Sequence, residues 1–168
     1  MNSVYKAVVC VICLAVLALA AITFAADDPI IGTWKLNLAK SRLSLSYYAS
    51  IKRAAPKEKV EIYRKIEGDQ IELSGTEIGT DGSSRSGKRT WARQGGITKH
   101  QPPEPAEVSV IETLIAPGDW YVTSLQNGKQ IRVMHKVISK DGKTMTQTIT
   151  GTDAQGNPWG QLLVYDRQ

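Results

Sequence analysis

The sequence predicts an all-β domain, folded as an antiparallel up-and-down barrel of about eight to ten strands. Gly-Asp, Asp-Gly and Asn-Gly dipeptides separate runs of residues with high β-propensity, and such dipeptides favour the positive φ angles of tight hairpin turns. Most strands are joined to their chain neighbours, and closing such a meander into a barrel removes both free edges. A β-sandwich is the alternative, although its two sheets usually need longer crossovers.

The turn dipeptides are Gly68-Asp69, Asp81-Gly82, Asn127-Gly128 and Asp141-Gly142. Two segments break the hairpin pattern. Residues 39–56 are predicted to form a short helix or helical turn that covers one end, and residues 94–105, with "QPPEP", to form a loop or an irregular edge. The predicted strands are residues 31–36, 58–66, 70–79, 84–93, 107–115, 119–126, 130–139, 143–151 and 158–166.

The first residues have the layout of a secretory signal peptide. Lys6 precedes an apolar run at 7–21, and Thr23-Phe24-Ala25 places small residues at the −3 and −1 positions of a cleavage site. We therefore expect a signal peptide at 1–25, a single domain at 26–168, and export to the periplasm or the medium. An uncleaved membrane anchor is the alternative, because the apolar run approaches spanning length.

Composition disfavours several functions. The chain has 21 basic and 16 acidic residues, and its basic residues at 52–53, 57–59, 64–65 and 88–89 are interrupted by Glu and apolar positions. This scatter indicates a solvated basic surface, not a nucleic-acid interface. Both cysteines lie in the apolar run, and the chain has two histidines. We therefore expect no metal, no cofactor and no thiol nucleophile. No serine relay is apparent either, so an enzyme is disfavoured.

The stretch "GTWKLN" at 32–37 resembles the Gly-x-Trp first strand of lipocalins and fatty-acid-binding proteins, the calycin group of barrels. The chain also resembles small exported bacterial lipocalin-like proteins of unknown role, through this start with Lys40-Ser41, "SKDGKTMT" at 139–146 and "VYD" at 164–166. The resemblance implies that Gly32 and Trp34 form a plug at the closed end, with Arg167 stacked over the Trp34 ring. The Arg-x-Tyr pair that fatty-acid-binding proteins use on a ligand carboxylate is missing.

The hairpin turns predict which residues line the interior. Two-residue loops at Asn127-Gly128 and Asp141-Gly142 place Tyr121 opposite Met134, and Met134 opposite Ile149. Alternate threonines at 144–150 suit a solvated strand face. The opposite face is therefore expected to be interior, and it carries Tyr121, Leu125, Arg132, Met134, Lys136, Ile138, Met145, Gln147 and Ile149.

These features predict a non-enzymatic binding protein for a small apolar or amphipathic molecule. Arg132 and Lys136 would meet an anionic group of the ligand, or else pair with an internal carboxylate or reach water at the barrel mouth. An interaction or inhibitor protein that engages a protein partner and uses a filled barrel as its scaffold is the alternative, and a small-barrel enzyme is less favoured. The candidate ligand-binding residues are Tyr121, Arg132, Met134, Lys136, Met145 and Gln147.

Overall fold

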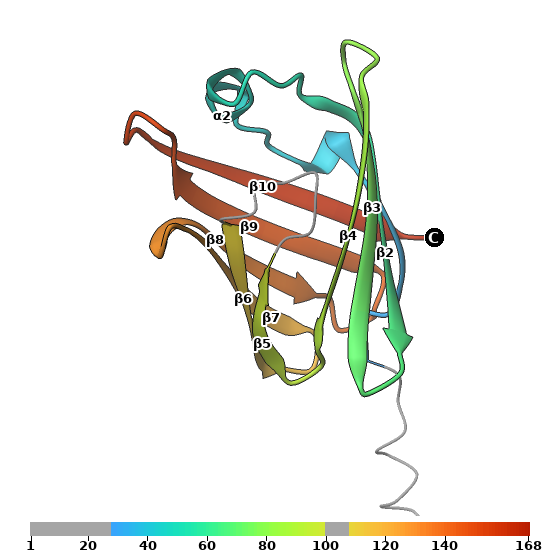
Figure 1. The fold of residues 1–168 in the computed structure, drawn as a ribbon. Helices are drawn as coiled ribbons and strands as arrows, with labels where there is room; N and C mark the ends of the chain where they lie inside the picture. The colour runs from blue at the N-terminus through green and yellow to red at the C-terminus, as the bar shows by residue number, and fades with distance from the viewer. Residues whose placement is uncertain (1–27, 100–107) are drawn as a thin grey trace, which may run out of the picture.

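The computed structural model describes residues 28–99 and 108–168, and within them ten strands form one antiparallel, nearly closed barrel (Figure 1). The predicted signal peptide lies outside the described residues. The strands are β1 (Gly32–Leu36), β2 (Pro56–Ile66), β3 (Gln70–Gly79), β4 (Ser84–Ala92), β5 (Gly95–Lys99), β6 (Val108–Ala116), β7 (Asp119–Gln126), β8 (Lys129–Ile138), β9 (Thr144–Thr152) and β10 (Pro158–Arg167).

The strand order shows how the sheet closes. It runs β4-β3-β2-β1-β10-β9-β8-β7-β6-β5, so the first and last strands pair with each other and β4 and β5 are the edges. Trp34 of β1 lies opposite both Glu61 of β2 and Arg167 of β10. Figure 1 shows the wall of β2, β3 and β4 facing the wall of β8, β9 and β10. The barrel prediction is confirmed, and the sandwich alternative is wrong.

All nine predicted strands are present in the described residues, with bounds within two residues of those expected, and a tenth strand is present as well. Asn127 and Gly128 have φ angles of 50° and 76°, as a type I′ hairpin requires. The tenth strand, β5, lies in the segment 94–105, for which the sequence predicts a loop or an irregular edge; it is one edge of the sheet and pairs with β6. Gly95 permits this pairing, because a Cβ there would lie 2.5 Å from the Glu112 carbonyl oxygen. Residues 100–105 lie outside the described residues.

The predicted helical segment is present after β1. It consists of a 3-10 turn, η1 (Leu38–Lys40), and a short helix, α2 (Leu45–Ser50), whose N-cap Ser44 accepts a hydrogen bond from the Tyr47 backbone N–H. The Tyr47 ring stacks on Trp159 of β10, with centroids 4.0 Å apart. This contact attaches the helix to the barrel. In the described part of the chain, neither helical segment is long and apolar enough to cross a bilayer.

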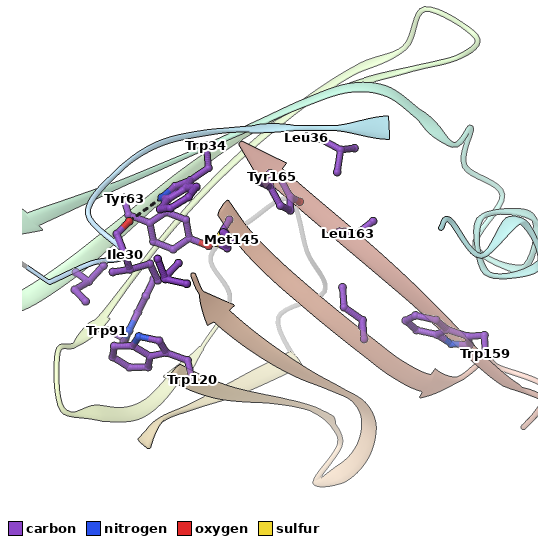
Figure 2. Close-up of a cluster of buried hydrophobic side chains, with 13 residues drawn as sticks. Ile30, Trp34, Leu36, Tyr63, Trp91, Trp120, Met145, Trp159, Leu163 and Tyr165 are labelled. Atoms are coloured by element: carbon purple, nitrogen blue, oxygen red, sulfur yellow. Dashed lines mark hydrogen bonds between the residues drawn. The ribbon is translucent and has the colours of Figure 1, made fainter. Parts of the chain in front are cut away.

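Gly32, Trp34 and Arg167 meet at one end of the barrel. Trp34 is fully buried, and its indole N–H donates to the Ile30 carbonyl oxygen at 2.8 Å, the dashed line in Figure 2. The Arg167 guanidinium lies 4.3 Å from the Trp34 ring centroid and donates to the carbonyl oxygens of Ile31 and Gly142 at 2.7 and 2.6 Å. A Cβ at Gly32 would lie 2.7 Å from the Arg167 Nη1 atom. The glycine therefore leaves room for the arginine.

The β8–β9 register is as expected, but the predicted β7–β8 register is wrong. A bulge between Ser124 and Leu125 adds one residue, Ile131, to β8, so Tyr121 pairs with His135 instead of Met134. A shift of one residue exchanges the two faces of a strand. Val122 is therefore inside, and Tyr121 is outside, 42% exposed and stacked on His135 at 4.4 Å. The interior assignments of Tyr121 and Leu125 are corrected accordingly.

Candidate functional site

Part of the barrel interior is a cavity of about 260 Å³. The inner faces of β2, β3 and β4 form one wall, and Arg132 and Met134 of β8 contribute from the opposite side. Leu73 and Met134 supply apolar surface. The charged residues in the lining are Arg53, Lys59, Glu61, Glu77, Arg85, Lys88, Arg89 and Arg132, of which Lys88 has a mostly exposed side chain.

A cluster of aromatic and aliphatic side chains packs the rest of the interior (Figure 2). Trp91 makes edge-to-face contacts with Tyr63 and with Trp120, at centroid distances of 6.2 and 6.4 Å. Met145 and Tyr165 are fully buried in the same cluster. Because close-packed side chains leave few voids larger than a water molecule, the cavity occupies only part of the barrel.

Glu61 projects inward from β2 and accepts four polar contacts. Its Oε2 atom accepts from the Tyr63 hydroxyl at 2.7 Å and from Gln147 Nε2 at 2.9 Å. Its Oε1 atom accepts from the Tyr165 hydroxyl at 3.1 Å and lies 3.3 Å from Lys59 Nζ. Burial alone would raise the pKa of Glu61, but Lys59 and Lys136, with the hydrogen bonds from Tyr63 and Gln147, lower it to about 2. Glu61 is therefore a buried carboxylate anion.

Lys136 is buried beside this network, with 1% of its surface exposed. Its ammonium lies over the rings of Tyr63 and Trp91, at 4.7 and 5.8 Å from their centroids. Burial lowers the pKa of Lys136 to about 8, against the opposing effect of Glu112 and Glu61. Lys136 therefore packs over aromatic rings, and the nearby carboxylates Glu112 and Glu61 favour its charged form.

Arg132 differs from its charged neighbours in the cavity wall. Its Nε and Nη2 atoms donate to the Ser124 hydroxyl at 3.2 and 3.0 Å, and no carboxylate pairs with it within residues 28–99 and 108–168. By contrast, Lys59 pairs with both Glu61 and Glu77, at 3.3 and 3.8 Å. Because its hydroxyl partner is neutral, the positive charge of this guanidinium is available to an anionic group of a ligand.

A second ion pair in the wall joins Arg89 to Glu112. The Arg89 Nη2 atom lies 2.8 Å from Glu112 Oε1, and the two side chains are 11% and 0% exposed. Arg89 lies on β4 and Glu112 on β6. The ion pair therefore crosses the side of the barrel where the edge strands meet.

The structure separates the six candidate ligand-binding residues into three groups. Arg132 and Met134 line the cavity, whereas Lys136, Met145 and Gln147 are buried without lining it. Tyr121 lies on the outer surface, because of the bulge in β8.

Sequence reasoning missed Glu61, Lys59, Arg89 and Glu112, since scattered charges were interpreted as solvated. Alternation in "KVEIY" at 59–63 places Lys59, Glu61 and Tyr63 on one face and could have indicated their burial. In the described part of the chain no cluster of His, Cys, Asp or Glu is arranged to hold a metal ion.

Comparisons with known proteins identify the fold. No protein-family model matches the chain, and a search of curated proteins returned no match. Among solved structures, the wild-type fluorescent protein UnaG aligns at 16% identity over 83% of this chain and 97% of its own, with a TM-score of 0.56. Zebrafish ileal bile acid-binding protein, solved with cholic acid, aligns at 12% identity over 83% of this chain and 99% of its own, with a TM-score of 0.56. The chain therefore has the β-barrel fold of the fatty-acid-binding-protein and lipocalin type.

Proposed function

We propose that this protein is a non-enzymatic binding protein that holds a small amphipathic anion inside its barrel. The acid group of the ligand binds Arg132, and its apolar part packs against Leu73 and Met134. The observation that carries the proposal is a cavity-lining guanidinium that donates to a neutral hydroxyl, whereas Lys59, Arg85 and Arg89 in the same lining pair with carboxylates. Met134 suits such a wall, because a thioether side chain adapts to irregular shapes.

The size of the cavity limits the ligand. Its volume of about 260 Å³ is slightly below the range of about 300–1,000 Å³ that is usual for small-molecule sites. A compact acid with a short apolar body fits better than a long acyl chain. The bile acid-binding protein of the same fold, solved with cholic acid, supports a ligand-binding role.

Export is part of the proposal. It is supported by Lys6, the apolar run at 7–21 and Thr23-Phe24-Ala25, which together predict cleavage after Ala25. The protein then acts in the periplasm or outside the cell, where it binds small molecules that reach that compartment.

Replacing Arg132 tests the site. We expect Arg132→Met to weaken octanoate binding at least several-fold and to leave 1-octanol binding nearly unchanged. The reason is that a charge-assisted hydrogen bond contributes about 1.5–3 kcal/mol and only the acid makes one. Isothermal titration calorimetry with this matched acid and alcohol measures both affinities.

The control is Lys129→Met, which removes an exposed cation from the same strand. It should affect neither ligand. Equal losses for acid and alcohol in Arg132→Met contradict the assignment of Arg132. No binding of either ligand to the wild type contradicts the proposed function and favours a scaffold that engages a protein partner.

A further inference from the structure

Four donors from three strands converge on the carboxylate of Glu61. The hydroxyls of Tyr63 (β2) and Tyr165 (β10), the amide of Gln147 (β9) and the ammonium of Lys59 (β2) give each carboxylate oxygen two partners. Two donors on each oxygen are the arrangement that any ionised carboxylate requires in a buried position. The surrounding groups therefore form an anion site, and Glu61 fills it.

The orientation of Gln147 supports this description. Its side chain is 1% exposed, and it turns its NH₂ group to Glu61 while its own Oε1 atom has no hydrogen-bond partner in the described part of the chain. Leaving a buried carbonyl oxygen unpaired is unfavourable. The hydrogen bond from the amide NH₂ group to the charged carboxylate of Glu61 is stronger than a hydrogen bond between neutral groups, and it offsets this cost.

Glu61 also lines the cavity that contains Arg132. The cavity therefore has an inner group of donors for an acid group, which a side chain of the protein itself occupies, and a further donor at Arg132, whose partner is neutral.

We infer that Glu61 is a specificity-determining residue, a built-in carboxylate that closes the inner anion site and restricts the acid group of a ligand to Arg132. The restriction at Arg132 rests on the proposed function, whereas the anion site beneath Glu61 does not. Removal of the Glu61 side chain should leave a site that accepts a small free carboxylate.

The first experiment measures the thermal stability of Glu61→Ala in sodium acetate and in sodium chloride at the same ionic strength. Acetate should raise the Tm of this variant by about 2–6 °C more than chloride, because a ligand that binds only the folded state stabilises it. The wild type should show a clearly smaller difference, because its inner site is filled and only Arg132 is left for acetate. Glu58→Ala, which removes a half-exposed glutamate of the same strand that pairs with Lys35, should behave like the wild type.

If Glu61→Ala does not fold in chloride, the readout is the fraction of folded protein recovered when acetate replaces chloride, measured by circular dichroism. Specific recovery in acetate supports the built-in carboxylate. Equal Tm values in the two salts, or no acetate-specific recovery, overturn it. This result does not depend on whether the wild type binds a ligand.

The second experiment tests the restriction to Arg132. Octanoate should bind the wild type and should bind Arg132→Met at least several-fold more weakly. In the double variant Glu61→Ala/Arg132→Met its affinity should be restored, because its acid group can enter the vacated inner site. If acetate stabilises Glu61→Ala but octanoate binding is not restored in the double variant, only the restriction of the acid group to Arg132 is contradicted. Absence of octanoate binding to the wild type contradicts the proposed function and leaves the acetate experiment to decide the inner site.

Discussion

At the scale of single residues, Arg132 and Lys136 show how much the electrostatic partner matters. They share the inner face of β8, and alternation along the sequence placed both there. The charged neighbours of Lys136 could not be predicted, because Glu61 and Glu112 come from β2 and β6, far away in the chain. Strands that are distant in the chain therefore determine that Lys136 lies in the packed interior and that Arg132 lines the cavity.

The ionised state of Glu61 predicts how stability depends on pH. Its pKa falls from 4.5 to about 2 on folding, so the unfolded chain binds its proton first as the pH is lowered. The stabilisation is complete above pH 4.5 and is lost as the pH falls through that value toward about 2. From about pH 6 to pH 3 the wild type should lose about 2 kcal/mol more unfolding free energy than Glu61→Gln.

Urea denaturation of both proteins at several pH values measures this difference. Glu58→Gln provides the control, since Glu58 is half exposed on the same strand and its loss should leave the wild-type pH profile unchanged. Parallel pH profiles for wild type and Glu61→Gln contradict a lowered pKa at Glu61.

At the scale of elements, turns could be predicted and bulges could not. The Asn127-Gly128 turn forms as expected, yet the extra residue Ile131 changes the pairing of everything beyond it in the β7–β8 hairpin. Nothing in "KQIRVM" distinguishes a bulged strand from a regular one, because the alternation remains intact on either side. The β8–β9 register has no such insertion, and there the prediction is confirmed.

The bulge at Ile131 requires a small residue at position 151 on the neighbouring strand. A Cβ at Gly151 of β9 would lie 2.5 Å from the Ile131 carbonyl oxygen and 2.8 Å from the Trp159 ring. Because backbone cannot move aside as a flexible side chain does, Gly151→Ala should lower the unfolding free energy by about 1–3 kcal/mol. Chemical denaturation checks this value.

Gly160 offers a matched comparison on the adjacent strand. A Cβ there would meet its nearest atom at 3.6 Å, an ordinary contact. Gly160→Ala should therefore be neutral or stabilise by up to about 1 kcal/mol, through the reduced entropy of the unfolded chain. Similar losses for the two alanines contradict a role for the bulge.

At the scale of the whole molecule, the barrel is closed by hydrogen bonds everywhere except between β4 and β5, the two edges of the described sheet. Side chains bridge this seam. Arg89 of β4 pairs with Glu112 of β6, and Trp91 of β4 packs on Trp120 of β7. The sequence predicted a closed barrel because a meander must dispose of its edges, but it gave no indication of which pair would remain open.

The Arg89–Glu112 pair should therefore matter more than an ion pair on the surface. Arg89→Leu leaves the fully buried Glu112 carboxylate without its partner and should cost about 3–5 kcal/mol of unfolding free energy. The double variant Arg89→Leu/Glu112→Leu removes both charges and should recover most of that loss. A double-mutant cycle in urea measures the coupling.

The exposed pair Lys35–Glu58, on the neighbouring strands β1 and β2, is the reference for this cycle. Its coupling should be below about 1 kcal/mol. If the Arg89–Glu112 coupling is equally small, side-chain closure of the seam is contradicted.

The two junctions of the barrel divide the chain into two runs of strands. Within β1 to β4 and within β5 to β10 each strand pairs with the next along the chain, and these two runs meet along the β1–β10 ladder on one side and at the seam on the other. At the seam the connection is a single short turn, around Arg93 and Gln94. A cut at that turn breaks no ladder of the described sheet. The molecule thus has a natural division into two complementary fragments, whose reassembly relies on the pairing of the first strand with the last.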